Sequence, residues 1–473
     1  MHRQLRYFTR FCVVCVLTGR NGLLLELLKE LEELVAHSQA ALTAAERSEW
    51  STVLREFRAF TQVLQPLAVM HVPPQSVGGI DAGSAMVPVE VERRLRLELT
   101  EPQAELLRVS PVMAPVEKVS LCEVVLVGTV AGQPKFHELP LDVFRMLQAL
   151  EWQPSAVPGT QQQQQQQQQA AVAGAPPSPL VNPHKYVLHR ATAAQLSLVL
   201  ATAMVEMPPG GALLLYLSAS GVATTAAAAA AAAAGGGGGG AAASADSPDG
   251  LWKQGGVALS PNADSQAARH ACCLRAADLW PFCRLPLFLV VESDNAGAFR
   301  ALPAAAAVVS GAPLLCLLAP RSWLQLGGGG LLTLFLHEPL AAFALLGGVT
   351  QTPQATHRKL DDMLLTSFTR MTRALLACPE TPQACLAFLC DPFLRMLLLR
   401  FVFCHATLTL FKPPKGGTLE LPTSVPALPD AVLRHENTLG IVRQLAAILG
   451  IIGQFHATPP LEVVGSSAKS SAA

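Results

Sequence analysis

Charged residues are scarce in this chain. Asp, Glu, Lys and Arg make up 14% of its 473 residues, against roughly 25% in ordinary soluble domains. The two signs also balance, with 34 Lys plus Arg and 34 Asp plus Glu. A neutral chain has no long-range attraction for a phosphate backbone, so we expect no direct binding to nucleic acid.

Long uninterrupted apolar segments are also lacking, although 51% of the residues are hydrophobic. A membrane-spanning helix needs about 18 or more consecutive apolar residues. The nearest candidates, residues 331–346 and 396–411, are interrupted by charged residues, histidine or proline. Residues 3–17 resemble a short signal peptide, but no small-residue cleavage site follows them. We therefore expect a soluble protein with no membrane partner.

The cysteine pattern argues against a secreted protein. The chain has 11 cysteines, an odd number, and most lie in apolar runs, as Cys122, Cys316 and Cys404 do. A buried free thiol behaves as a small hydrophobic side chain. This pattern favours a reducing compartment, the cytosol or the nucleus.

Residues 1–67 have the pattern of three consecutive helices. Apolar residues recur at helical spacing through residues 2–17 and again through residues 24–35. Thr43 and Glu46 have the spacing of a capping box, which predicts the start of a third helix. The short links between these segments indicate an antiparallel helical layer.

Strand and helix patterns then alternate along the chain. Apolar strand patterns lie at residues 119–130, 212–217, 287–291 and 313–318, and residues 185–190 are strand-like. Helix patterns lie at 141–153, 191–206 and 295–302. Near-continuous apolar strands are typical of a parallel sheet with helices on both faces. We therefore predict an α/β fold with a Rossmann-like, largely parallel central sheet and right-handed crossovers.

The other segments complete the predicted organisation. Tracts of Gln, Ala and Gly cannot bury a core, so they predict disordered inserts. The predicted parts are a helical N-terminal part at 1–67, a loop at 68–90, a strand-helix segment at 90–155, a Gln/Pro-rich insert at 156–181, an α/β core at 182–221 and 270–346, an Ala/Gly-rich insert at 222–269, a helical C-terminal part at 353–456, and a short connection within it at 412–430.

Several of these segments resemble the suppressor of cancer cell invasion (SCAI) family. The likeness is carried by LRYFTRFCVVCVL at residues 5–17, KFHELPLDVFRMLQALEWQPS at 135–155, NPHKYVLHR at 182–190, GALLLYLSASG at 211–221, DLWPFCRLPLFLVVESDNAGAF at 278–299, LLTLFLHEPLAAF at 331–343 and FLCDPFLRMLLLRFVFCHATL at 388–408. Together these segments follow the family's order along nearly the whole chain. The family usually has a further helical region before the first segment, so the chain looks N-terminally truncated. The Gln, Ala and Gly tracts are foreign to the family's core and fall between its segments, as tolerated loop insertions do.

The resemblance implies a non-enzymatic transcriptional corepressor that acts in the nucleus, and also in the cytoplasm, as a protein-binding scaffold. Its implied partners are coactivators of serum response factor and chromatin factors, and its implied effect is to limit cell migration. A scaffold for chromatin-based DNA repair is the alternative. The family offers no catalytic, cofactor or metal residues to carry over, and it implies no small-molecule substrate.

The cysteines raise the question of a metal site. Cys12 and Cys15 have the spacing of a zinc knuckle, but no second knuckle accompanies them, so we interpret both as buried apolar side chains. Cys378, Cys385, Cys390, Cys404 and His405 are close in sequence but irregularly spaced. Cys385 and Cys390 do not share a helix face. We predict no metal site among these residues.

Three other motifs could indicate enzyme chemistry. His337, Glu338 and Pro339 do not form H-E-x-x-H, and the proline would break the required helix. The glycine run at 327–330 precedes a helix and could bind an anion, although a flexible connector is our preferred interpretation.

The most suggestive motif is Glu292, Ser293, Asp294 and Asn295, which follows a predicted parallel strand. Ligands bind at that edge in α/β proteins, and two carboxylates there could hold Mg²⁺ in a hydrolase or phosphotransferase. We favour a structural role in which Ser293, Asp294 or Asn295 caps the following helix.

Overall fold

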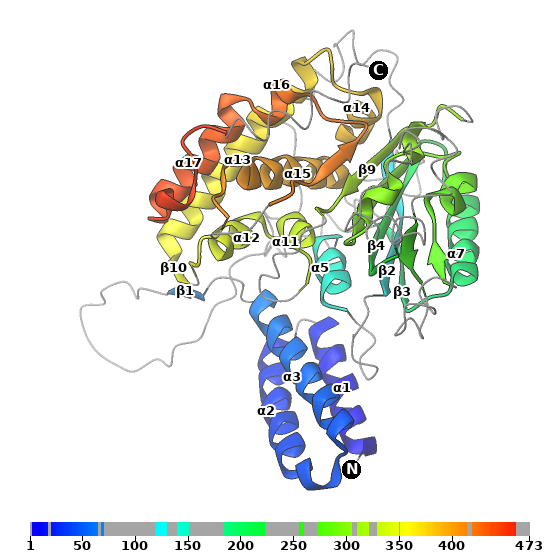
Figure 1. Cartoon of the computed structure of the whole chain (residues 1–473), viewed down its shortest axis with the longest axis vertical. Coiled ribbons are helices and arrows are strands. Elements are labelled where there is room, and N and C mark those ends of the chain that lie inside the picture. The colour runs from blue at the N-terminus through cyan, green and yellow to red at the C-terminus, as the bar shows by residue number, and fades with distance from the viewer. Residues whose placement is uncertain are drawn as a thin grey trace, which may run out of the picture.

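The computed structural model describes residues 2–17, 20–64, 68–70, 119–129, 140–150, 183–222, 255–259, 272–304, 310–320, 329–349, 351–413 and 419–459. These residues form a central sheet with helices on both faces and a layer of three helices at one end (Figure 1). The predicted α/β class is confirmed.

The N-terminal layer consists of α1 (His2–Leu17), α2 (Asn21–His37) and α3 (Ala44–Leu64), with the short 3₁₀ helix η1 (Gln39–Ala41) before α3. Thr43 and Glu46 form the predicted capping box, because the Thr43 backbone N–H donates to Glu46 Oε2 at 2.8 Å and the Glu46 N–H donates to Thr43 Oγ1 at 3.3 Å. Trp50 and Phe57 of α3 are fully buried. In Figure 1 the layer extends away from the sheet.

The central sheet has six strands in the order β11-β9-β8-β4-β2-β3. Their bounds are β2 (Ser120–Thr129), β3 (His184–His189), β4 (Gly211–Ala219), β8 (Leu287–Glu292), β9 (Leu314–Leu318) and β11 (Thr423–Val425). The five predicted strands are all present and parallel, and β11 joins β9 antiparallel. Taken in chain order, the parallel strands have the doubly wound order of flavodoxin-like sheets, 2-1-3-4-5.

Each face of the sheet has its own hydrophobic core. On one face, side chains such as Val124, Tyr216 and Phe288 pack against α5 (Leu141–Leu150) and the C-terminal helices. On the other, alternate side chains of the same strands pack against α7 (Ala193–Glu206), η4 (Ala276–Phe282) and η5 (Ala296–Phe299). Burial on both faces explains why the strands are almost continuously apolar.

The C-terminal helices cover the α5 face of the sheet (Figure 1). They are α11 (Leu331–His337), α12 (Pro339–Leu346), α13 (Gln354–Ala377), α14 (Gln383–Leu389), α15 (Pro392–Leu410), α16 (Asp430–Leu433), α17 (Glu436–Ile448) and the 3₁₀ helix η6 (Ile452–Gln454). Helix α15 is long and apolar enough to cross a membrane, but almost all of it is buried among neighbouring elements, as in the core of a folded domain. Pro339, at the first position of α12, separates α11 from α12.

Several short strands correct the predicted loops and inserts. The prediction of a plain connection at 412–430 is wrong where β11 forms. The prediction of a loop at 68–90 is wrong for β1 (Ala68–Met70), which pairs parallel with β10 (Gln351–Pro353). The predicted disorder of 222–269 is wrong for β6 (Gly256–Ala258), which lies between β5 (Gly221–Val222) and β7 (Cys273–Leu274). Strands of two or three residues show no sequence period, so only their distant partners define them. The insert 156–181 and residues 223–254 and 260–269 lie outside the described residues.

Candidate functional site

The carboxyl ends of β2 and β4 mark the place where a doubly wound sheet usually binds its ligand. The connections from these two neighbouring strands leave in opposite directions, which ordinarily opens a crevice. Here the space is filled by buried side chains that we call the edge cluster: Asp142 and Arg145 of α5, Tyr216 and Ser218 of β4, Glu292 of β8 and Thr333 of α11. Each of these side chains is almost completely buried.

Asp142 ties α5 to the start of α11. Its two carboxylate oxygens accept the backbone N–H of Gly330 at 3.0 and 2.9 Å. Arg145, one turn further along α5, donates to Asp142 Oδ1 at 3.3 Å, and Ser218 Oγ donates to Asp142 Oδ2 at 3.4 Å. The carboxylate thus holds together a helix, the end of a strand and a loop that lie far apart in the sequence.

Glu292 makes the second connection between the sheet and α11. Its Oε2 accepts the Thr333 backbone N–H at 2.7 Å and the Thr333 hydroxyl at 2.8 Å. Tyr216 Oη lies 2.7 Å from the same threonine hydroxyl. Because that hydroxyl gives its one proton to Glu292, Tyr216 is the donor to Thr333. The three side chains form a buried hydrogen-bonded chain.

Burial dominates the acid–base properties of the edge cluster. It raises the pKa of Glu292 to about 8, with a further rise from the nearby negative charge of Asp142, while the bonds from Thr333 oppose the shift. Burial also raises the pKa of Asp142 and lowers that of Arg145, although their mutual attraction works against both changes. Burying a charged group away from water costs free energy, so each of these side chains must keep its hydrogen-bond or ion-pair partners inside the protein.

The glycine run is part of this arrangement. Gly329 has a φ of +79°, which favours glycine, and a Cβ there would overlap Asp142 and Arg145. A Cβ on Gly330 would overlap the carboxyl group of Glu292. The interpretation of the glycine run as a flexible connector is therefore wrong for these two glycines. The alternative, binding of an acidic group at the start of the helix, holds, but the acidic groups belong to the chain itself. The acidic groups bound at the start of α11 are the chain's own side chains, Asp142 and Glu292; residues 327 and 328 lie outside the described part.

The Glu292 to Asn295 motif is divided between separate contacts. Glu292 belongs to the edge cluster, whereas Asp294 accepts the backbone N–H of Gly221. Asn295 is the residue before η5 but makes no side-chain cap; its Nδ2 donates to the carbonyls of Val222 at 2.9 Å and Gly256 at 3.1 Å. The predicted cap is wrong because these side chains tie the small β5-β6-β7 sheet to the main one. The two carboxylates of the magnesium alternative have separate partners.

The prediction that Cys12 and Cys15 are buried apolar side chains is confirmed. All eleven cysteines are free thiols. Cys12 and Cys15 of α1 are buried, and burial raises the pKa of the Cys12 thiol to about 12. Burial likewise raises the pKa of Cys385 to about 12 and that of Cys404 well above its usual value. Such buried thiols pack as small hydrophobic side chains.

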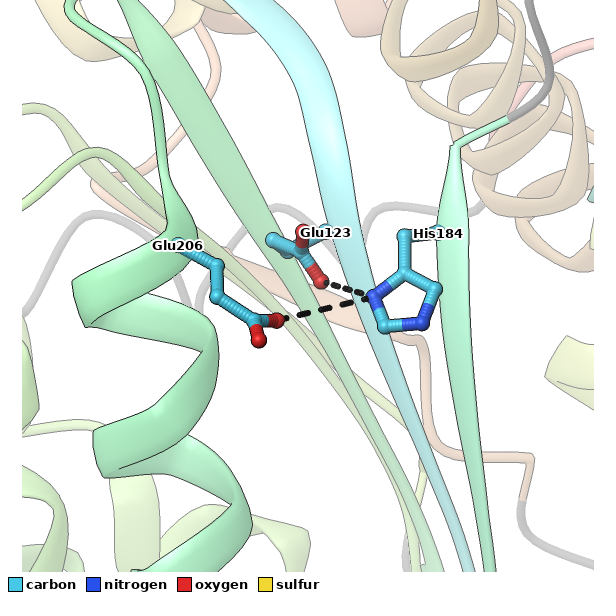
Figure 2. A group of neighbouring side chains, drawn as sticks. All are labelled: Glu123, His184 and Glu206. Atoms are coloured by element: carbon cyan, nitrogen blue, oxygen red, sulfur yellow. Dashed lines mark hydrogen bonds and ion pairs between the residues drawn. The ribbon is translucent and has the colours of Figure 1, made fainter.

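A second group of polar side chains lies at the opposite, amino edge of the sheet. Glu123 of β2, His184 of β3 and Glu206 of α7 converge there (Figure 2). His184 Nδ1 lies 2.9 Å from Glu123 Oε2 and 3.9 Å from Glu206 Oε2. Among the residues that the structure describes, these are the three side chains that could share a metal ion. The sequence analysis missed them, although each lies at or near the end of a predicted element.

An open groove of about 640 Å³ lies between α13 and α17. Its lining includes Arg358, Asp362, Arg370, Glu436 and Asn437. These side chains carry both positive and negative charges, so the groove does not select for a ligand of one charge. Its place between two surface helices suits contact with another macromolecule better than catalysis.

A family model and proteins from three organisms match this chain over most of its length. The family model described as "Protein SCAI" matches residues 1–414. Protein SCAI of Mus musculus is 32% identical over 471 residues, covering 95% of this chain and 69% of the mouse protein. Protein SCAI of Homo sapiens is 31% identical, covering 96% and 70%, and the Protein SCAI homolog of Dictyostelium discoideum is 25% identical, covering 96% and 75%. No solved structure matches the chain.

Proposed function

Because the chain belongs to the SCAI family of regulatory proteins, we propose that it is a transcriptional corepressor that works by binding other proteins. Its partners in this proposal are coactivators of serum response factor, and its place of action is the nucleus. Binding of such a coactivator withholds it from the transcription complex. The chain thereby lowers expression of genes that promote cell migration.

The filled edge cluster is the observation that carries this proposal. In a doubly wound enzyme the carboxyl edge of the sheet holds the substrate or cofactor. In this chain Asp142, Glu292 and Arg145 occupy that space, and their polar atoms bond to one another, to Thr333 and to the backbone of α11. A protein whose usual ligand crevice is packed shut is suited to act through its outer surface.

The helical elements offer that surface. The N-terminal layer extends from the sheet, and the C-terminal helices form a broad cover over one of its faces (Figure 1). Grooves between surface helices are a common means of binding a partner's amphipathic helix. The scaffold function therefore needs the packed core only to hold these helices in place.

Two measurements test the proposal with the full chain. Purified chain is mixed with a purified serum response factor coactivator from the same organism, and complex formation is followed by analytical ultracentrifugation. In cells, a reporter gene that depends on the coactivator is measured as the amount of the chain is increased. We expect a saturable complex and a dose-dependent fall in reporter activity that extra coactivator reverses. No complex and no change in the reporter would refute the proposal.

A matched double variant separates scaffolding from catalysis. Glu292→Gln with Asp294→Asn keeps the size of both side chains and removes both acidic groups. A scaffold carrying these changes, checked by circular dichroism for intact folding, still binds the coactivator and still represses the reporter. Tight binding of Mg²⁺ or of a nucleotide by the wild type that the folded double variant loses would instead support the enzyme alternative.

A further inference from the structure

We propose that Glu123, His184 and Glu206 form a binding site for a divalent transition-metal ion of the zinc class. The site lies at the amino edge of the sheet, on the side covered by α7. It is separate from the edge cluster at the carboxyl ends of the strands. The inference is independent of the proposed corepressor function.

The fold itself brings the three ligands together. Glu123 and His184 are direct neighbours in the parallel register of β2 and β3. Glu206 is the last residue of α7, the helix that returns the chain from the end of β3 to the amino edge where β4 begins. Figure 2 shows the three side chains pointing toward one another from these elements. Two strands and a helix therefore fix the backbone positions of all three ligands.

The spacing of the ligand atoms suits a zinc-sized ion. Zinc binds imidazole nitrogen and carboxylate oxygen at about 2.0–2.2 Å, so neighbouring ligands in a tetrahedral site lie roughly 3.4 Å apart. The observed distances from His184 Nδ1 are 2.9 Å to Glu123 Oε2 and 3.9 Å to Glu206 Oε2, one on each side of that value. All three ligand atoms lie within 4.8 Å of one another. Small rotations of the side chains would equalise these distances.

The burial of Glu123 indicates the need for a positive charge. Its side chain is 8% exposed, and within the described residues its ion-pair partner is His184, which is 56% exposed. Burying a carboxylate away from water is costly unless it is paired, and Glu206 adds a second carboxylate beside it. A divalent cation would balance both carboxylates.

Tyr186 supports the ligands from outside the group. Its hydroxyl donates to Glu206 Oε2 at 2.8 Å, and this bond raises the pKa of Tyr186 to about 12. Its ring also contacts the His184 imidazole edge-on, with ring centres 4.6 Å apart. Hydrogen bonds of this kind orient metal-binding carboxylates and are typical of metal sites. His184 and Glu206 are about half exposed, so water can fill the remaining positions on the ion.

A surface ion-pair network is the competing explanation, and zinc binding distinguishes the two. Full-length chain, stripped of metal and kept reduced, is titrated with zinc chloride by calorimetry. Zinc can also bind to free thiols, so the decisive quantity is the difference between variants. We expect the wild type to bind one more equivalent of zinc than His184→Ala, and to gain thermal stability on binding. His37→Ala, which removes an exposed histidine outside the group, should match the wild type.

Two further variants keep the test independent of folding defects. Glu206→Gln changes an exposed side chain at the end of a helix, and we expect it to weaken zinc binding at least tenfold. Tyr186→Phe leaves the ligands intact and should weaken binding about 10- to 100-fold, as the loss of an orienting bond does. Equal zinc stoichiometry and affinity in the wild type, His184→Ala and Glu206→Gln would overturn the proposal. So would zinc binding that disappears equally from every variant once the thiols are alkylated.

Discussion

Replacing Glu292 by glutamine should change how the stability of the protein depends on pH. Glu292 has a pKa of about 8 in the folded protein and 4.5 as its ordinary value. Between these values the folded state holds a proton that the unfolded state has lost. The free energy of unfolding therefore falls as pH rises, by up to about 1.4 kcal/mol per pH unit. Glutamine cannot titrate, yet it keeps an oxygen that can accept the two bonds from Thr333.

The wild type should consequently lose stability relative to Glu292→Gln by an amount on the order of 3 kcal/mol between pH 5 and pH 8. Urea unfolding of both proteins at pH 5, 6, 7 and 8 gives this difference and cancels the titration of groups that do not interact with Glu292. Glu26→Gln, a change on the exposed surface of α2, is the matched control and should give a difference that is flat with pH. A flat difference for Glu292→Gln, or one that favours the wild type as pH rises, would refute the account of the edge cluster.

Three further changes test the packing. Asp391→Ala removes a buried side chain that accepts backbone N–H bonds from Leu121, Phe393 and Leu394, so urea unfolding should show a loss of about 3 kcal/mol. Asp391→Asn keeps one acceptor oxygen and should restore only part of this loss. Gly330→Ala should lower the melting temperature because its Cβ overlaps Glu292, whereas Gly453→Ala, with open space around it, should not. Brief treatment of the native protein with iodoacetamide should leave the buried thiols of Cys12 and Cys385 unmodified by mass spectrometry, and their rapid modification would contradict the structure.

The sequence predicted the elements whose signal is local. Strands β2, β4, β8 and β9 were evident because each is almost continuously apolar, whereas the edge strand β3 mixes polar and apolar residues. The start of α3 was evident because both partners of the capping box, Thr43 and Glu46, lie within one turn. Helix α5 was predicted from its apolar positions, but no sequence pattern indicated that Asp142 and Arg145 are buried. They are buried because α11 and the end of β4 cover them, and neither element is near them in the sequence.

The sites depended on pairings that no local pattern contains. Glu292 was correctly placed at the carboxyl edge of the sheet, but its partner Thr333 follows 41 residues later. Glu123 and His184 are 61 residues apart, and only the register of β2 on β3 makes them neighbours. Strand β11 was missed for the same reason, since its three residues form a strand only by pairing with β9. In each case the sequence did not show which distant segments lie side by side.

The position of β11 has a consequence for synthesis on the ribosome. Strand β9 ends at Leu318, and the strand that covers its outer edge begins only at Thr423. Until that late segment emerges, β9 presents an unpaired row of backbone groups flanked by leucine side chains, a surface prone to join other chains. A nascent chain paused between these points, or one cut there by a protease, would therefore be a target for chaperones and for aggregation.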